Sequence, residues 1–247
     1  MAYQINFPET DARADQDAEV CEVVIDGKRR QIRFHDYDEI YRIPGLYEQL
    51  FYDHLECRSP TVVCELLAEQ LQEGGYDPAN QSVLDLGAGN GMVGERLRAM
   101  GCGNIVGVDI IPEARSAAER DRPGAYSEYV VGDLTAPTPE VEEALQRHRF
   151  GILTTVAALG FGDIPPEAFA YAFGLLSPGG WLAFCIKEDF LAEEEPSGFS
   201  QLIQRMMADG TLEVFARRRY QHRLSMNGEP LHYVAMVGRK TTEATAA

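Results

Sequence analysis

Glycines and an aspartate in the middle of the chain could form a binding site for a nucleoside-containing ligand. Residues 83–97 read VLDLGAGNGMVGERL, with glycines at positions 87, 89, 91 and 94. Glycine lacks a Cβ atom, so the backbone at these positions can approach a ligand closely. Asp109 stands 18 residues beyond Gly91, and a carboxylate at that offset can accept hydrogen bonds from both hydroxyls of an adenosine ribose.

The glycine segment alone is compatible with two cofactors. The string GAGNG suits a loop for S-adenosylmethionine (SAM). The glycines at 89, 91 and 94 also spell the G-x-G-x-x-G of a dinucleotide-binding fold. Asp109 fits either ligand, so the choice depends on the rest of the chain.

Three further features help to choose. In the sequence Gly-Asp-Leu, Asp133 could receive the adenine amino group and the amide of Leu134 could meet a ring nitrogen. Residues 175–181 read LLSPGGW, whose glycines allow a sharp turn from a helix into a strand. A helix over 199–208 then leads into an antiparallel hairpin of strands 212–224 and 231–240, joined around Asn-Gly.

The apolar pattern predicts the elements that position these residues. The apolar run before the glycines predicts a strand, and Val93, Leu97 and Met100, spaced i, i+4 and i+7, predict a helix after them. Strands and helices then alternate, which indicates parallel strands joined by right-handed crossovers. The predicted strands are 105–110, 129–131, 150–157 and 181–186, and the predicted helices are 112–120, 139–148 and 165–176.

The chain before residue 58 has a different pattern. We expect the first 17 residues, which are polar and acidic, to be poorly ordered. Strands over 20–25 and 31–34 flank Asp-Gly-Lys, a β-hairpin signal, and a tyrosine-rich segment follows. Ser59 is the expected N-cap, and Pro60 the first residue, of a helix that ends at the glycine pair 74–75. We therefore separate an N-terminal cap, residues 1–57, from a main domain, residues 58–242.

The order of DLGAGNG, VDI, GDL, LLSPGGW and the closing hairpin resembles the class I SAM-dependent methyltransferases. The resemblance covers about residues 60–240 and identifies the main domain as a methyltransferase domain. It implies an α/β, Rossmann-like sheet of seven mostly parallel strands in the order 3-2-1-4-5-7-6, with the seventh strand antiparallel. It also implies an enzyme that uses SAM and transfers its methyl group by in-line displacement.

The resemblance further implies which residues bind SAM. The glycine loop matches the family's segment around the methionyl part of SAM. Asp109 matches the acidic residue that binds the ribose, and Ile110 matches the apolar residue that packs against adenine. Gly94 is assigned to helix packing. The full implied set is Asp85, Gly87, Ala88, Gly89, Asn90, Gly91, Asp109, Ile110, Asp133, Leu134, Val156 and Ala157.

The methyl acceptor is expected to be a small molecule. Methyltransferases that act on planar amines of nucleic acids or glutamine carry a [DN]-P-P-[YF] motif after the fourth strand, whereas residues 154–159 read TTVAAL. The net charge of −17 also argues against binding a nucleic acid, because such binding depends on Lys and Arg.

The resemblance places the acceptor above the fourth and fifth strands, beneath the N-terminal segment. We hypothesise that part of a lid over SAM and acceptor is formed by His35, Tyr37, Tyr41, Tyr47 and Tyr52. Ordinary packing would explain any single one of these tyrosines equally well. Residues 187–190 (KEDF) could touch the acceptor, while His222 and His232 are expected to be structural and residues 193–195 to form an exposed loop. The sequence identifies no general base, so the catalytic residues stay unassigned.

The composition and the apolar pattern also indicate the redox state of the cysteines and the cellular location of the protein. Five cysteines without a C-x-x-C pair predict reduced thiols and no metal site. Neither a signal peptide nor an apolar stretch of ~18 to 20 residues is present in this sequence, so we expect a cytoplasmic protein that binds no membrane. A monomer or a homodimer is expected.

Two alternatives stay open at this point. An NAD(P)-linked oxidoreductase fits the G-x-G-x-x-G spacing, but no separate catalytic domain or Tyr-x-x-x-Lys pair is evident. A non-catalytic SAM-binding module is the other alternative, because no general base is identified.

Overall fold

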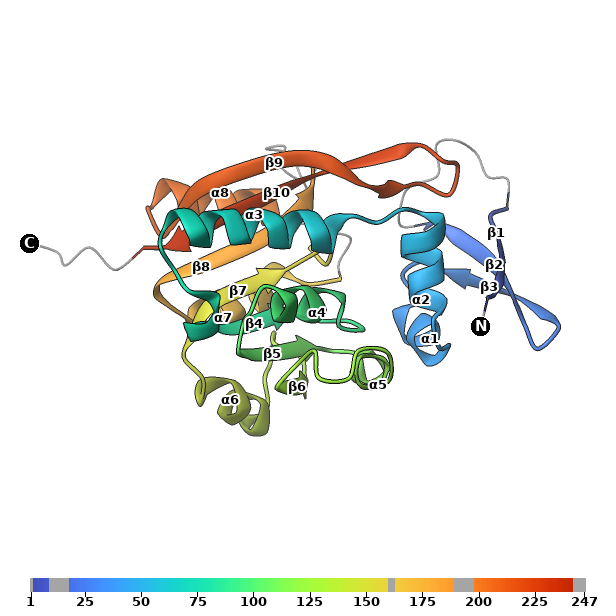
Figure 1. Cartoon of the computed structure of the whole chain (residues 1–247), viewed down its shortest axis with the longest axis horizontal. Coiled ribbons are helices and arrows are strands. Elements are labelled where there is room, and N and C mark those ends of the chain that lie inside the picture. The colour runs from blue at the N-terminus through green and yellow to red at the C-terminus, as the bar shows by residue number, and fades with distance from the viewer. Residues whose placement is uncertain (1, 9–17, 160–162, 189–197, 242–247) are drawn as a thin grey trace, which may run out of the picture.

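A seven-stranded sheet forms the centre of the protein in a computed structural model that describes residues 2–8, 18–159, 163–188 and 198–241 (Figure 1). The strand order is β6-β5-β4-β7-β8-β10-β9, and β10 runs antiparallel to both β8 and β9. Counted from β4, this is the order 3-2-1-4-5-7-6 with an antiparallel seventh strand, so the predicted fold is confirmed. The strands are β4 (Ser82–Leu86), β5 (Asn104–Asp109), β6 (Glu128–Val131), β7 (Phe150–Thr155), β8 (Leu176–Lys187), β9 (Leu212–Leu224) and β10 (Pro230–Lys240).

Helices cover both faces of this sheet (Figure 1). One apolar cluster joins it to α3 and α4, and a second joins the opposite face to α6, α7 and α8. Because both faces are buried, most residues of the central strands are apolar, as is typical of parallel sheets. The helices are α3 (Ser59–Glu73), α4 (Met92–Ala99), α5 (Pro112–Asp121), α6 (Pro139–Gln146), α7 (Pro166–Leu175) and α8 (Phe199–Ala208), with a short 3₁₀ turn, η3 (Pro78–Asn80), before β4.

The LLSPGGW segment differs from the predicted turn. The strand β8 already begins at Leu176, and its pairing with β7 shifts between Phe150 and Ile152, so the extra residues form an irregularity inside the strand. Gly179 has a φ of +75°, and its carbonyl accepts a hydrogen bond of 2.9 Å from Nε of Arg239. The sharp change of direction is therefore accommodated within the sheet rather than before it.

Residues before α3 form a separate layer beside the sheet, which we call the cap (Figure 1). It consists of the antiparallel strands β1 (Gln4–Asn6), β2 (Val20–Ile25) and β3 (Lys28–Arg33), the helices α1 (Tyr37–Arg42) and α2 (Leu46–Glu48), and a π-helical turn, η2 (Gln49–His54). The expectation of disorder before residue 18 is wrong for β1, which pairs with β2. The predicted hairpin is present, but β3 begins at Lys28 because Asp26 and Gly27, both with positive φ, form a two-residue turn.

The start of α3 also differs from the prediction. Ser59 is the first helical residue and Arg58 is the N-cap. The Ser59 hydroxyl lies 2.6 Å from Oη of Tyr220 and 2.6 Å from Nδ1 of His222, so it is engaged with β9 and does not cap the helix. The predicted end of this helix at Gly74 is confirmed.

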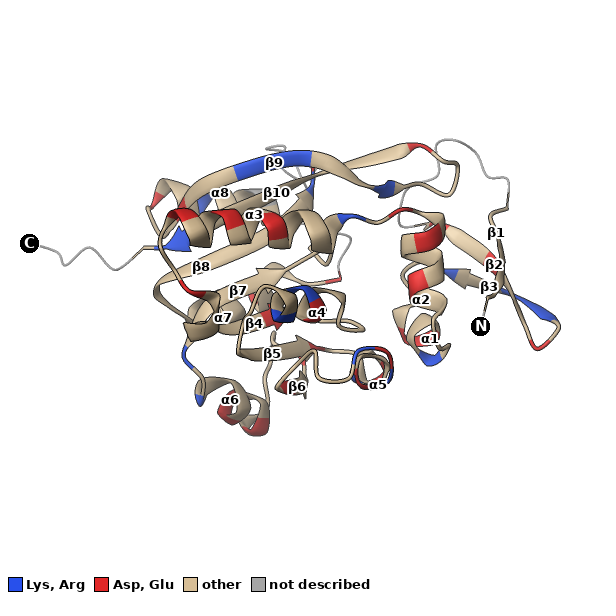
Figure 2. Ribbon diagram, in the orientation of Figure 1, with Lys and Arg blue, Asp and Glu red and all other residues tan. Residues whose placement is uncertain are grey.

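Charged residues are unevenly distributed, with a band of arginines on β9 (Figure 2). Arg217, Arg218 and Arg219 follow one another there. Arg218 pairs with Glu69 of α3 at 2.8 Å, and Arg219 pairs with Glu188 at 2.9 Å. Part of this positive charge is thus compensated within the protein.

Candidate functional site

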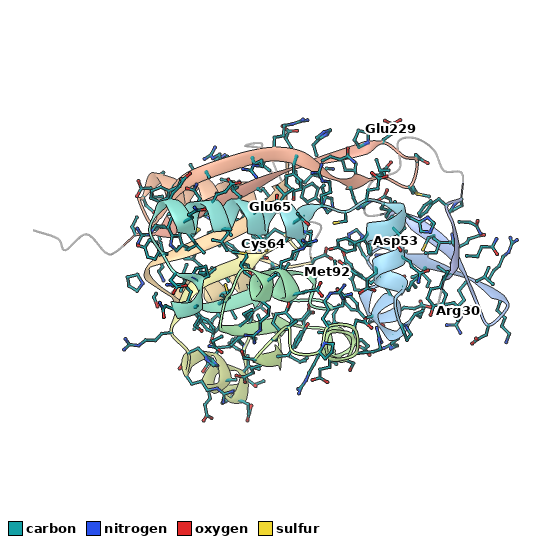
Figure 3. The ribbon with its side chains drawn as sticks, in the orientation of Figure 1. Arg30, Asp53, Cys64, Glu65, Met92 and Glu229 are labelled. Carbon is teal, nitrogen blue, oxygen red and sulfur yellow. The ribbon has the colours of Figure 1, made fainter. Side chains whose placement is uncertain are left out.

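A pocket lies at the carboxyl ends of the parallel strands, between the sheet and the cap. The space free of protein atoms, including its open mouth, is about 1070 Å³. The side chain of Met92, labelled in Figure 3 at the start of α4, belongs to its wall. Of the twelve residues predicted to bind the cofactor, ten line this pocket: Gly87, Ala88, Gly89, Asn90, Asp109, Ile110, Asp133, Leu134, Val156 and Ala157.

The glycine loop after β4 needs glycine for two physical reasons. Gly87 and Gly89 have φ of +72° and +52°, a region that L-residues with a Cβ occupy at a cost. A Cβ on Gly89 would also lie 2.6 Å from Oη of Tyr41, and one on Gly87 would lie 2.9 Å from Cδ1 of Ile164. Gly91, with φ of +92°, is the N-cap of α4 and does not line the pocket.

Gly94 lies away from the pocket, inside α4. A Cβ there would be 2.6 Å from Cζ of Tyr126. Close packing against a ring therefore explains this glycine, as predicted, and the third glycine of the G-x-G-x-x-G spacing contributes nothing to the site.

Asp109, at the end of β5, is fixed by two backbone amides. One carboxylate oxygen accepts a hydrogen bond from N of Gly89 and the other from N of Ile111, both at 2.9 Å. Each oxygen keeps a second lone pair, which can accept a ligand hydroxyl. Burial raises the pKa of this carboxyl. The neighbouring Ile110 is 57% exposed and presents an apolar surface beside it.

Asp133, just beyond β6, has a different environment. One of its carboxylate oxygens accepts hydrogen bonds from Oγ1 and N of Thr135, at 2.7 and 2.8 Å, and these bonds lower its pKa. The ionised group can act only as an acceptor, which suits an amino group. Leu134 follows it as a buried residue of the pocket wall.

Asp85 lies beneath the glycine loop and not on the pocket surface, which differs from its predicted place. The residue is 1% exposed. Its carboxylate accepts hydrogen bonds from Oγ1 of Thr154 and from Oη of Tyr126, both at 2.7 Å. The Tyr126 hydroxyl also lies 3.1 Å from the carbonyl oxygen of Ala88 in the loop. Burial raises the pKa of Asp85 to about 7. The residue is therefore placed to position the loop.

Several residues that hold the loop were not found from the sequence. Tyr129 of β6 donates a 2.7 Å hydrogen bond to the carbonyl of Gly89. Glu48 of the cap accepts one of 2.7 Å from Nδ2 of Asn90 and one of 2.6 Å from Arg122. No motif connects these positions in the sequence, so only the folded structure reveals that the cap and the loop are joined here.

The cap supplies a wall of tyrosine rings. Tyr37, Tyr41, Tyr47 and Tyr52 line the pocket, whereas His35 does not. The ring centroids of Tyr41 and Tyr47 are 5.3 Å apart. Burial raises the pKa of all four phenols, which are neutral at physiological pH. The location of these rings agrees with the hypothesis of a lid over the site.

The remaining candidates lie outside the pocket wall. His222 stacks on Tyr233 with centroids 4.0 Å apart, and burial lowers its pKa, which fits the structural role predicted for it. His232 lies in β10, and Lys187 is the last residue of β8. Glu188 forms its ion pair with Arg219. Asp189, Phe190 and the loop 193–195 lie outside the described residues.

All five cysteines are free thiols. In the part of the chain that the structure describes, no three His, Cys, Asp or Glu side chains are grouped as a metal site would need. No helix of the described ranges is both long and apolar enough to cross a bilayer.

Known proteins match most of the chain. A family model described as "Methyltransferase domain" matches residues 56–227. The ribosomal RNA large subunit methyltransferase E of Methanoculleus marisnigri is 25% identical over 193 residues, which are 71% of this chain and 83% of that protein.

Solved structures share the fold. The N-methyltransferase NodS of Bradyrhizobium japonicum, in complex with S-adenosylhomocysteine, has a TM-score of 0.56 and 14% identity, covering 85% of this chain and 98% of that one. The magnesium protoporphyrin IX methyltransferase of Synechocystis PCC 6803, with bound SAM, has a TM-score of 0.50 and 13% identity, covering 74% and 79%. At these identities the likeness establishes the fold alone.

Proposed function

The chain belongs to the methyltransferase domain family, and on that premise we propose that it transfers the methyl group of SAM to a small-molecule acceptor held between the sheet and the cap. The protein is an enzyme, and SAM is its cofactor. The dinucleotide alternative is wrong, because the family is that of methyltransferases and Gly94 serves packing.

The residues of the pocket fit SAM in chemistry and order. Asp133, Asp109 and the glycine loop follow β6, β5 and β4, which are neighbours in the sheet. Asp133 would hold the adenine of SAM, Asp109 its ribose, and the glycine loop its methionyl part. Val156 and Ala157 would lie beneath the sulfonium. SAM carries no phosphate, so the site needs no basic side chain, and none is among the described residues that line it.

The composition of the pocket wall carries the proposal of a small acceptor. Four tyrosines and Cys57 face the space, and no Lys or Arg does among the described lining residues. Binding a phosphate backbone depends on such cations. The arginine band of β9 is partly paired and is not part of the pocket wall. These observations favour a metabolite over the ribosomal RNA named for the relative from Methanoculleus marisnigri.

The chain's own contribution to the reaction is alignment. When bound, SAM would supply an electrophilic methyl group for in-line attack by the acceptor. Positioning the two reactants can contribute about 7 to 11 kcal/mol. The loop anchored by Asp85, Asp109 and Tyr129 fixes one reactant, while the tyrosine wall excludes water and shapes the space for the other.

Two measurements test the proposal. Isothermal titration should show binding of SAM and of S-adenosylhomocysteine, and its absence would contradict the cofactor assignment for these residues. Release of S-adenosylhomocysteine should be stimulated by fractions of small metabolites and not by ribosomal RNA. Stimulation by ribosomal RNA alone would show that the acceptor assignment is wrong while leaving methyl transfer intact.

A further inference from the structure

We propose that the acceptor is an amine that enters the pocket as a cation, and that Asp163 binds it and takes its proton. This inference rests on the proposed function and concerns the end of the pocket that the cofactor residues leave unused. It assigns a catalytic residue where the sequence identified none.

The position of Asp163 follows from the order of the strands. The pocket wall contains three carboxylates, and two of them, Asp133 and Asp109, follow β6 and β5 at the nucleoside end. Asp163 lies at the other end, just before α7. Its neighbour Ile164 packs over Gly87, at the end of β4. Asp163 is therefore beside the place where the methyl group would point, away from adenine.

The cap approaches this carboxylate through His35. Nε2 of His35 lies 3.8 Å from Oδ2 of Asp163, and the His35 side chain is only 11% exposed. The His35 ring meets Tyr37 edge-on with centroids 5.7 Å apart. Burial, and next the charge of Asp163, raises the pKa of Tyr37, so this phenol is neutral. His35 does not line the pocket and is a positioning residue that acts through Asp163.

The charges in the pocket select the acceptor class. An anionic acceptor would meet Asp163 and no cation among the described lining residues. An ammonium group would meet a carboxylate and tyrosine rings, whose faces attract cations. The same carboxylate offsets the repulsion between the ammonium group and the positive sulfur of SAM. An amine therefore satisfies the site better than a carboxylic acid does.

The proton and the electron pairs of the proposed reaction are all accounted for by the amine, SAM and Asp163. An ammonium nitrogen has no lone pair, so one N–H proton first passes to the carboxylate of Asp163. The freed lone pair forms a bond to the methyl carbon while the carbon–sulfur bond breaks and its electron pair stays on sulfur. The products are a methylated ammonium ion, S-adenosylhomocysteine and a proton that leaves Asp163 for water.

The substitution Asp163→Asn tests the role directly, because it keeps the size and removes the charge and the basicity. We expect kcat/KM for an amine acceptor to fall by about a hundredfold, the lower range for a general base. SAM affinity by isothermal titration should change by less than about twofold, since Asp163 is not among the residues that would hold the cofactor. Asp209→Asn, an exposed aspartate outside the pocket, is the matched control and should leave both values unchanged.

His35→Gln tests the positioning role. It should lower kcat with little change in the KM of the amine, and it should have no further effect when combined with Asp163→Asn, because the two residues act as one unit. His232→Gln, on β10, is the control. A merely structural role for His35 would instead give additive losses in the double variant.

The wild-type protein decides the acceptor class independently of any variant. Amines should stimulate release of S-adenosylhomocysteine, and carboxylic acids and phenols of similar size should not. If SAM binds and only phenols or acids are methylated, or if Asp163→Asn keeps its activity on amines, this inference is wrong and the proposed function stands. Failure to bind SAM would instead overturn the proposed function.

Discussion

The two walls of the pocket are built on different principles. The sheet wall depends on backbone geometry, because Gly87 and Gly89 adopt positive φ and backbone amides hold Asp109 and Asp133. The cap wall is made of side chains, chiefly tyrosine rings from α1, α2 and η2. The first wall depends on local chain geometry, and the second depends on how the cap packs against the domain.

This difference separates cofactor from acceptor. A backbone wall tolerates little change in residue type, since a Cβ at Gly87 or Gly89 meets neighbouring atoms. A wall of rings can change its shape through side-chain substitution without altering the sheet. The glycine loop is joined to the cap through Glu48, which binds both Asn90 and Arg122. The four predictions below test how independent the two walls are.

The largest effect is expected where the walls touch. In Gly89→Ala, the new methyl group would lie 2.6 Å from Oη of Tyr41 in a backbone conformation with φ of +52°. The backbone cost of about 1 to 2 kcal/mol and an overpacking cost of similar size should weaken SAM binding by about a hundredfold or more in isothermal titration. The loop would have to move away from Asp109 or displace a buried ring.

Two variants accompany this measurement. Gly210 has a φ of +77°, so Gly210→Ala has a similar cost in backbone free energy. Its Cβ would have no atom within 4 Å, and SAM affinity should therefore not change. Adding Tyr41→Phe to Gly89→Ala removes the crowding hydroxyl and should recover part of the affinity. An unchanged SAM affinity in Gly89→Ala alone would show that the cap moves away from the new methyl group at little cost in free energy. The two walls would then be independent.

The second effect concerns stability as a function of pH. The pKa of Asp85 is about 7 in the folded protein, because of burial, against an ordinary 3.8. A raised carboxyl pKa means that the folded state binds the proton more tightly, so this group's contribution to stability falls between about pH 4 and pH 7 and is constant above pH 7. Relative to Asp85→Asn, the free energy of unfolding of the wild type should fall by about 2 to 3 kcal/mol from pH 5 to pH 8.

Urea unfolding of both proteins at the two pH values measures this difference. Asp209→Asn serves as the comparison, because Asp209 is exposed and hydrogen bonds to Thr211 lower its pKa. A constant difference between wild type and Asp85→Asn would mean that the carboxyl titrates as an ordinary aspartate.

The sheet wall could be predicted from the sequence, and the reason is its local construction. The loop, Asp109 and Asp133 each follow a strand, and parallel strands place their carboxyl ends along one edge. The ends of α8 were likewise predicted from the local sequence pattern, which depends on neighbours a few residues apart. The order of the seven strands was implied by the resemblance to a known family and not by any local signal.

The links between elements could not be predicted, because their partners are far apart in the chain. Glu48 and Asn90 are separated by 42 residues, Asp85 and Tyr126 by 41, and no spacing rule connects them. The same cause explains the error at Ser59, whose hydroxyl binds residues more than 160 positions away. Asp163 is not in any motif. Its proposed role becomes visible only when the fold places it beside His35 and the glycine loop.

A third, smaller effect is expected at the link between the walls. Glu48→Gln keeps one acceptor oxygen but removes the charge that pairs with Arg122, whose side chain is 9% exposed. Losing a hydrogen bond to a charged group should lower the free energy of unfolding by about 1.5 to 3 kcal/mol, partly offset by Glu95 at 3.5 Å. In Glu69→Gln, which breaks the exposed pair with Arg218, the change should stay below about 1 kcal/mol. Equal losses in urea unfolding would show that the link is no stronger than a surface pair.

The smallest effect is expected from the loss of a single hydroxyl, either one that supports the glycine loop or one in the cap wall. Tyr129→Phe removes the 2.7 Å hydrogen bond to the carbonyl of Gly89, and a lost bond of about 1 kcal/mol should weaken SAM binding by about fivefold. Tyr47→Phe removes a hydroxyl from the cap wall and should shift the acceptor KM while SAM affinity stays within about twofold. Isothermal titration and steady-state kinetics separate the two readouts. If Tyr47→Phe weakened SAM binding as much as Tyr129→Phe, the cap would be part of the cofactor site, and the division between a backbone wall and a side-chain wall would not correspond to a division between cofactor and acceptor.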